Sequence, residues 1–231
     1  MGPGDGTTIV TGGTGGLGVG VVRALVEAGH DVLVTWVVPQ ELEHFPNDLR
    51  DRCRLERVDV LAEAELPDLV ARQLNGVWAL VHLVGGYLDG SPVADMAMDG
   101  WDRQFDLNLR SAALAMRAVL PSMTAHGAGR VVAVTTRAAV RPFAGASAYA
   151  ASKAALITLV KTASEEVRQS NVCVNCIAPS VIDTPGNRAT NPTADTDRWV
   201  SPADIGAVIA FLCAPESRAI TGAMIPVYGR A

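Results

Sequence analysis

Tyr149 and Lys153 are the two residues whose types and spacing point most directly to chemistry. They fall within residues 148–167, whose content of Ala, Leu, Lys and Glu predicts a helix. Four positions apart on a helix, the two side chains share a face and can reach one ligand. A neighbouring ammonium stabilises a phenolate and lowers the pKa of a phenol from about 10. Tyr149 would then exchange protons near neutral pH.

The same spacing also has an ordinary structural interpretation. A Tyr-x-x-x-Lys taken alone is more often a half-buried aromatic ring followed by a solvated surface charge. The choice between the two interpretations therefore depends on the rest of the chain.

A glycine-rich segment near the N-terminus supports the chemical interpretation. Residues 7–10 are a short β-branched run, the next eight residues are TGGTGGLG, and residues 19–27 have helical apolar periodicity. A strand, a glycine-rich turn and a helix form the unit that holds a nucleotide pyrophosphate, because small residues let the backbone approach the phosphates and the helix N-terminus offers free N–H groups. No Gly-Lys-Ser/Thr follows, which argues against a P-loop. The glycines fit several dinucleotide templates, and a plain flexible turn is the remaining alternative.

The elements that must position these residues alternate along the chain. We expect strands at residues 7–10, 31–38, 53–60, 76–84, 130–135, 172–177 and 224–228, and helices at 19–27, 66–74, 101–120, 148–167 and 201–212. The nearly unbroken apolar run at 76–84 suits a parallel strand that is covered on both faces. The expected fold is an α/β, doubly wound parallel sheet of the Rossmann type, with three layers in a single domain over residues 1–231.

Composition excludes several other classes of protein. The 231 residues carry a formal net charge of -5, which argues against a nucleic-acid partner. No run of about 18 apolar residues and no signal-peptide pattern occurs, so we expect a cytoplasmic protein outside the membrane. The four histidines lack metal-ligand spacing, and Cys173 and Cys176 would point to opposite faces of a strand. No metal site is expected.

Several separated motifs, in this order, resemble those of the short-chain dehydrogenase/reductase (SDR) family over nearly the whole chain. They are the loop from Thr11 to Gly18, Asp59-Val60, Asn108, Thr136, Tyr149 with Lys153, Pro179 with Thr184, and Pro202-Ala203-Asp204. The resemblance implies an NAD(P)-dependent oxidoreductase of the single-domain branch. Such an enzyme, a carbonyl reductase or alcohol dehydrogenase, transfers hydride between nicotinamide and a carbonyl or alcohol carbon of a small molecule. It also implies a homo-oligomer, either a dimer or a homotetramer.

The resemblance assigns four catalytic residues. Tyr149 would be the acid and base, and Lys153 would lower its pKa and bind the nicotinamide ribose. Thr136 stands where the family usually has serine, and its hydroxyl would hydrogen-bond the substrate oxygen, although the added methyl group crowds the site. Asn108 would support a water relay to Lys153, or would be a local structural hydrogen bonder.

The resemblance also implies a set of cofactor-binding residues. Asp59 would meet the adenine amino group, and Val60 would offer its backbone N–H. Trp36 either packs near the adenine or is a core aromatic. The full set is Gly12, Thr14, Gly15, Gly16, Leu17, Gly18, Trp36, Asp59, Val60, Gly85, Tyr149, Lys153, Pro179, Ile182 and Thr184.

The choice between NAD and NADP is left undecided by the sequence. Trp36 is not the carboxylate that would accept from a ribose 2′-hydroxyl, and Val37 is not an arginine that would pair with a 2′-phosphate. We therefore expect weak discrimination. A strong preference would require another residue, such as Arg54 or Arg57, to reach the ribose.

Two other functions compete with simple oxidation or reduction. One is a non-catalytic dinucleotide-binding regulator, which the retention of Tyr149, Lys153 and Asn108 disfavours. The other keeps the nicotinamide chemistry but results in isomerisation or dehydration, which the sequence does not separate from reduction. The substrate pocket is expected to be lined by Tyr87, Val140, Arg141, Phe143 and the loop at residues 182–199.

Overall fold

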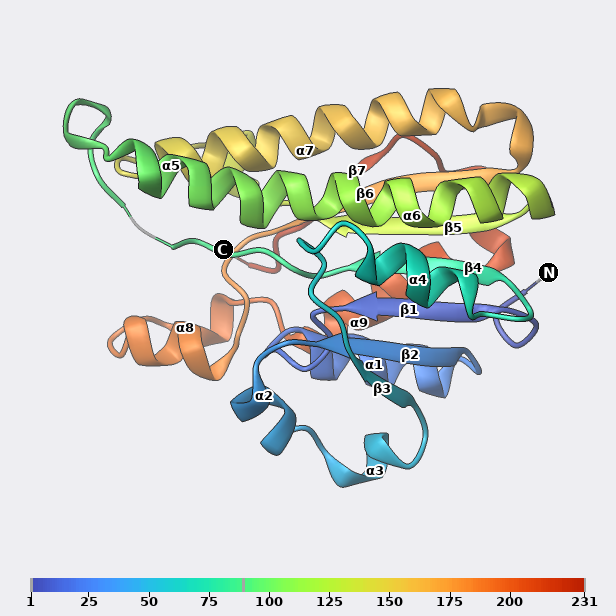
Figure 1. The fold of residues 1–231 in the computed structure, drawn as a ribbon. Helices are drawn as coiled ribbons and strands as arrows, with labels where there is room; N and C mark the ends of the chain where they lie inside the picture. The colour runs from blue at the N-terminus through green and yellow to red at the C-terminus, as the bar shows by residue number, and fades with distance from the viewer. Residues whose placement is uncertain (1, 89, 231) are drawn as a thin grey trace.

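One seven-stranded sheet forms the centre of the protein in the computed structural model, which describes residues 2–88 and 90–230 (Figure 1). All neighbouring strands are parallel, in the order β3-β2-β1-β4-β5-β6-β7. Their bounds are β1 Thr7–Thr11, β2 Asp31–Trp36, β3 Arg54–Arg57, β4 Val77–His82, β5 Gly129–Val134, β6 Val172–Pro179 and β7 Met224–Val227. The expected doubly wound parallel sheet is confirmed.

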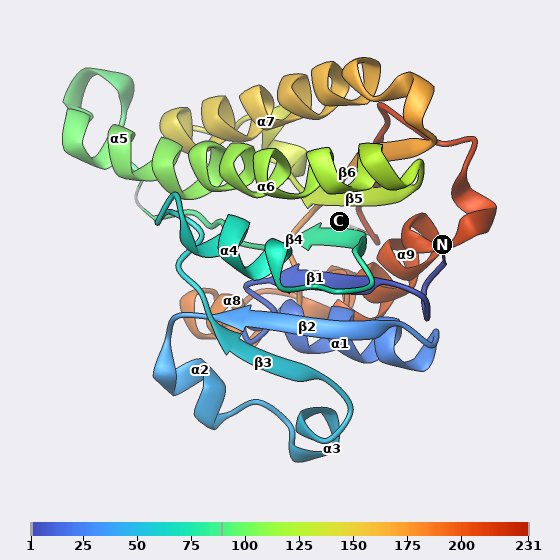
Figure 2. The ribbon, with the colours of Figure 1, turned by 45° about the vertical axis from the view of Figure 1, so that its right-hand side comes forward.

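Helices cover both faces of the sheet (Figure 2). α4 (Glu65–Ala71), α6 (Ser111–His126) and α7 (Ser147–Glu166) share one apolar core with the sheet, whereas α1 (Gly18–Glu27) and α9 (Pro202–Cys213) share the core on the opposite face. The other helices are α2 Pro39–Glu43, α3 Asn47–Arg50, α5 Met98–Phe105 and α8 Pro185–Thr190. The result is a helix–sheet–helix arrangement, since each strand of the centre is buried on both faces.

The long helix expected at residues 101–120 is not one regular helix. A π-helical segment, Asp106–Arg110, interrupts it between α5 and α6. Such a segment contains an extra residue in one turn and is common at functional sites. Here it contains Asn108, whose fully buried amide is held by hydrogen bonds to Gly86 and Ser152. Apolar periodicity does not report this insertion, because the flanking turns stay amphipathic.

The strand expected at residues 53–60 is also shorter than predicted. β3 ends at Arg57, because the Asp59 backbone N–H bonds the Glu65 side chain and the Asp59 carboxylate accepts from the Leu61 N–H, 2.9 Å away. The polar segment 39–52 forms α2 and α3, and the loop expected after β6 contains α8. The early end of β3, helix α2 and helix α8 lie at the carboxyl edge of the sheet, whereas α3 lies beside α1, where Asp48 pairs with Arg23.

No helix among residues 2–88 and 90–230 has the length and apolar character needed to cross a membrane. Within the same ranges, no group of three or more His, Cys, Asp or Glu side chains is arranged to hold a metal ion. The four cysteines are free thiols.

His82 at the end of β4 joins three elements through hydrogen bonds. Its Nδ1 lies 2.8 Å from the Thr11 hydroxyl of β1, and its Nε2 lies 3.1 Å from the Ser111 hydroxyl of α6. The side chain is 1% exposed, and burial, with a smaller contribution from the positive charge of Lys153, lowers its pKa from 6.5 to about 3. The folded protein therefore holds His82 as a neutral imidazole.

This burial predicts that acid weakens the fold. Below the unfolded-state pKa the unfolded chain binds a proton that the folded chain does not, so the free energy of unfolding falls as pH decreases below 6.5. His82 alone lowers the free energy of unfolding by about 2 kcal/mol between about pH 7.5 and pH 5. Buried His30, whose pKa is lowered to about 4, adds to the loss. Urea unfolding at several pH values measures the slope.

The matched variants isolate the contribution of His82. His82→Gln should flatten the pH dependence, whereas His126→Gln, at an exposed histidine, should leave the slope as in the parent. An unchanged slope in His82→Gln would show that the pKa of this histidine is not lowered in the folded protein.

Candidate active site

A cleft of about 920 Å³ lies at the carboxyl edge of the sheet and contains most of the predicted site residues. Its walls come from the glycine-rich loop, the ends of β4, β5 and β6, helix α7 and the start of α8. The predicted site residues that line this cleft are Thr14, Gly15, Gly16, Leu17, Gly85, Thr136, Tyr149, Lys153, Pro179, Ile182 and Thr184. The structure therefore brings the glycine-rich loop near the N-terminus into the same cleft as Tyr149, which is far away in the sequence.

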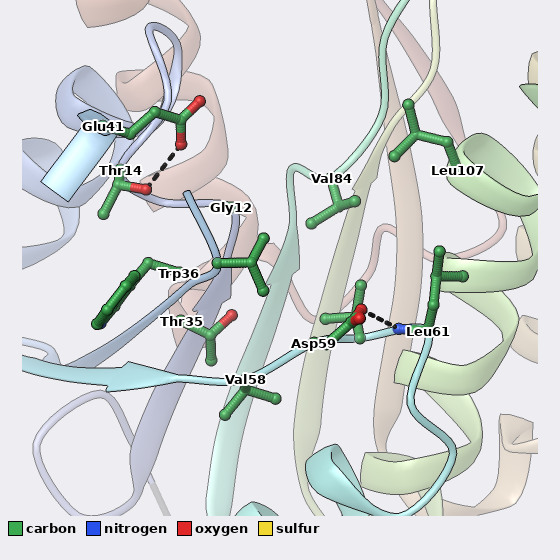
Figure 3. Close-up of a pocket in the computed structure, with 12 residues that line it drawn as sticks. Gly12, Thr14, Thr35, Trp36, Glu41, Val58, Asp59, Leu61, Val84 and Leu107 are labelled. Carbon is green, nitrogen blue, oxygen red and sulfur yellow. Dashed lines mark hydrogen bonds between the residues drawn. The ribbon is translucent and has the colours of Figure 1, made fainter. Parts of the chain in front are cut away.

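A smaller cavity of about 170 Å³ continues from the cleft toward β2 and β3 (Figure 3). It contains the predicted residues Gly12, Thr14, Trp36, Asp59 and Val60. The ring of Trp36 lines this cavity and is only partly buried, so it is not a core aromatic. The two cavities share Thr14 and Glu41.

Tyr149 lies in the first turn of α7 with its hydroxyl group close to that of Thr136. Burial raises the pKa of Tyr149 above its ordinary value, and a hydrogen bond with the Thr136 side chain partly offsets this. The expected lowering of the phenol pKa by Lys153 is thus not the net effect in this structure. A neutral phenol is the form that can donate a proton.

Lys153 is 4% exposed, and its ammonium donates a 2.8 Å hydrogen bond to the backbone carbonyl of Val134 at the end of β5. Burial lowers the pKa of Lys153 to about 8, because the charged form loses its hydration. The ammonium thus points toward the strand end instead of toward solvent.

Gly85 has no side chain, and the Lys153 ammonium occupies the space where a Cβ atom would lie. Its φ of +148° is disfavoured for other residues, and a Cβ atom there would lie 2.6 Å from Lys153 Nζ and 2.7 Å from Asn108 Oδ1. Asn108 accepts from the Gly86 N–H at 2.8 Å and donates to the Gly86 carbonyl and the Ser152 hydroxyl, both at 3.1 Å. Asn108 lines neither cavity, and its amide therefore holds the β4 end against α7.

Thr135 is a supporting residue that the sequence analysis did not identify. Its hydroxyl is buried and donates a 2.9 Å hydrogen bond to the backbone carbonyl of Lys153. This bond fixes α7 on the end of β5, at the residue before Thr136. The pair Thr135-Thr136 was visible in the sequence, but nothing there indicated that the two hydroxyls face different partners.

The glycine-rich loop is shaped by two different requirements. Gly12 has a φ of +70°, which turns the chain sharply after β1. Gly18, predicted to bind the cofactor, does not line either cavity, because it packs so closely on the Gly13 backbone that a Cβ atom would overlap it. The contribution of Gly18 is close packing of α1 against the loop.

An aromatic ring of the cleft wall, that of Tyr87, packs against Tyr149 and also against Phe143. The ring of Tyr87 meets that of Tyr149 edge-on, with centroids 5.4 Å apart, and meets Phe143 in the same manner at 6.0 Å. Tyr87 and Phe143 are about half exposed. Tyr87 lines the cleft together with Tyr149 and Thr136, and Phe143 packs behind it.

These features together define a class of site. The parallel sheet has a glycine-rich turn after its first strand and a cleft at the carboxyl ends of its strands. The smaller cavity lies where the strand order changes direction. This combination matches a dinucleotide-binding fold. The residues present fit such a cofactor, because Gly15 and Gly16 leave the loop backbone open to the cleft, where a pyrophosphate can approach it.

Comparisons with known proteins agree with this class. Residues 6–195 match the family model described as short chain dehydrogenase. Dehydrogenase/reductase SDR family member 4 of Oryctolagus cuniculus is 30% identical and covers 96% of this chain and 92% of its own length. A 3-oxoacyl-(acyl-carrier-protein) reductase of Rickettsia bellii is 28% identical, covering 96% and 95%. A short-chain type dehydrogenase/reductase from Mycobacterium ulcerans superimposes with a TM-score of 0.92 at 27% identity, covering 100% and 90%.

The chain belongs to the short-chain dehydrogenase/reductase family. It is therefore an NAD(P)-dependent oxidoreductase by family.

The close approach at Gly85 generates a prediction about stability. Gly85→Ala should lower the free energy of unfolding by about 1–3 kcal/mol, because it combines a strained φ with displacement of Lys153. Gly86→Ala is the matched control, since a Cβ atom there would have no described atom within 4 Å. Urea unfolding of both variants measures the difference. Equal stabilities would mean that the Lys153 side chain moves aside without cost.

Proposed function

We propose that this protein transfers hydride between NAD(P) and a carbonyl or alcohol carbon of a small molecule, with Tyr149 as the acid and base. The observation that carries the proposal is the common location of the Tyr149 phenol, the Thr136 hydroxyl and the Lys153 ammonium. All three line one cleft with the glycine-rich loop. The fold alone would not support a reaction, because many functions share it.

The cofactor, when bound, supplies or accepts the hydride. Tyr149 would donate its proton to the carbonyl oxygen during reduction, and the pKa raised by burial keeps this proton in place at neutral pH. The alcohol O–H would return the proton to Tyr149 in the reverse direction. Reduction therefore starts from the protonation state in which Tyr149 is already held.

Thr136 would orient the substrate oxygen. Its oxygen accepts from the Ala138 N–H at 3.2 Å, which fixes the side chain at the start of the short turn Arg137–Ala139. The hydroxyl proton can then point into the cleft, toward Tyr149 or toward a substrate oxygen. Lys153, held by Val134, would bind the nicotinamide ribose and remain charged below its pKa of about 8.

The aromatic wall suggests what surrounds the reacting carbon. The Tyr87 ring lines the cleft beside Tyr149 and is backed by Phe143, so a substrate with an apolar or aromatic group beside its carbonyl would be favoured. Assembly as a homo-oligomer and a cytoplasmic location stay predictions.

Tyr149→Phe tests the proton donor. Removing the phenol O–H while keeping the ring should reduce turnover by at least about 10²-fold and leave nucleotide affinity nearly unchanged. The assay is nicotinamide absorbance with a panel of ketones and alcohols and both cofactors. Tyr87→Phe is the matched control, because it removes a hydroxyl from the same cleft and should retain most activity.

The outcomes separate the two main functions. Substantial turnover by Tyr149→Phe would exclude this residue as the acid. Nucleotide binding by the parent protein without turnover on the panel would favour a dinucleotide-binding regulator.

A second pair of variants tests Thr136. Thr136→Ser keeps the hydroxyl and should remain active, whereas the isosteric Thr136→Val should lose about 10²-fold or more in kcat, as expected for loss of one donor to a developing oxyanion. Steady-state kinetics with one substrate from the panel measures both. Similar rates for the Ser and Val variants would limit Thr136 to its structural hydrogen bond with Ala138.

A further inference from the structure

A carboxylate that the sequence analysis did not identify, Glu41, stands where the two cavities meet. It lies on α2, five residues after β2 ends at Trp36. Its Oε2 accepts a 2.9 Å hydrogen bond from the Thr14 hydroxyl of the glycine-rich loop, as Figure 3 shows. A Cβ atom on Gly15 would lie 3.6 Å from Oε1, so the second oxygen lies over the loop backbone. Glu41 therefore faces the phosphate-binding loop.

The smaller cavity is acidic. Its charged lining residues are Glu41 and Asp59, and no lysine or arginine is among the described residues that line it. The Asp59 carboxylate already accepts from the Leu61 N–H, across the cavity from Glu41 (Figure 3). A negative group entering this cavity would thus meet negative charge without a compensating cation.

The two arginines considered as ribose contacts lie elsewhere. Arg54 hydrogen-bonds Asp31, Thr7 and Gln73 at the amino ends of β1 and β2, the edge of the sheet opposite the cleft. Arg57 lines a separate surface depression together with Arg72. Neither is among the residues that line the smaller cavity.

We infer that Glu41 selects NAD over NADP. The inference rests on the proposed function, since it concerns the adenosine end of the same dinucleotide site. A ribose with a free 2′-hydroxyl can donate a hydrogen bond to a carboxylate, as in NAD-selective dinucleotide folds. A 2′-phosphate instead brings about -1.5 to -2 charges and only acceptor oxygens, which the Glu41 carboxylate repels. Specificity then arises from repulsion of the wrong cofactor as well as from attraction of the right one.

The inference differs from the expectation of weak discrimination, and the binding measurement below decides between them. That expectation considered only positions 36 and 37, at the end of β2, where a carboxylate or an arginine is absent. α2 turns back over the loop, so position 41 faces the cavity. The alternative is that Glu41 only fastens α2 to Thr14 and does not contact the cofactor.

Direct binding without a substrate tests the inference. NADH and NADPH are titrated separately into the parent protein, Glu41→Gln and Glu43→Gln, and nucleotide fluorescence reports the dissociation constants. The parent should bind NADH at least about tenfold more tightly than NADPH. Glu41→Gln keeps an oxygen for Thr14 but removes the charge, so the ratio should fall by about tenfold, chiefly through tighter NADPH binding.

Glu43→Gln is the matched control on the same helix. Glu43 is exposed and is not among the described residues that line either cavity, so the parent ratio should be retained. Urea unfolding of each variant confirms that it is folded. A ratio that is the same in Glu41→Gln and the parent, or equal affinities in the parent, overturns the inference and leaves the proposed function intact. Failure of the folded parent to bind either nucleotide overturns both.

Discussion

The burial of the Lys153 ammonium at the end of β5 is the constraint on which the rest of the site depends. Removing such a charge from water costs several kcal/mol unless hydrogen bonds compensate for it. The Val134 carbonyl supplies one acceptor. The Thr135 hydroxyl holds the Lys153 backbone, and Gly85 leaves the space that the side chain needs. These contacts join β4, β5 and α7 around the Lys153 side chain, and the same arrangement places Tyr149.

Burial acts on the two titratable groups in the same sense, toward their neutral forms. It raises the pKa of the Tyr149 phenol and lowers that of the Lys153 ammonium to about 8. The Tyr149 phenol therefore keeps its proton at neutral pH, while Lys153 can still be charged. A solvated pair at the same spacing would have a freely ionised lysine and an ordinary phenol. The cleft, rather than the sequence spacing, gives the pair its properties.

The sequence was sufficient for the fold and for choosing motif residues that mostly line one cleft, because apolar periodicity and the glycine-rich turn are local signals. It was insufficient where a residue's partner comes from another element. The π-helical segment around Asn108 depends on hydrogen bonds to Gly86 and Ser152, which periodicity does not encode. Gly18 fits a cofactor motif but packs on Gly13. Glu41 was missed because it faces the glycine-rich loop only through the direction that α2 takes after β2, and the sequence does not show that direction.

The catalytic half of the cleft, around Lys153, and the adenosine half, around Glu41, differ in how well they tolerate substitution. Lys153, Asn108 and Thr135 are buried, and each is hydrogen-bonded to a neighbouring element, so substitution there disturbs packing as well as chemistry. Glu41 belongs to a five-residue helix without a buried residue and is attached to the loop by one hydrogen bond. A single part-buried hydrogen bond to a carboxylate contributes at most about 3 kcal/mol to the fold. The charge that faces the adenosine end can therefore change while the catalytic half keeps its geometry, which separates the choice of cofactor from the mechanism of proton transfer.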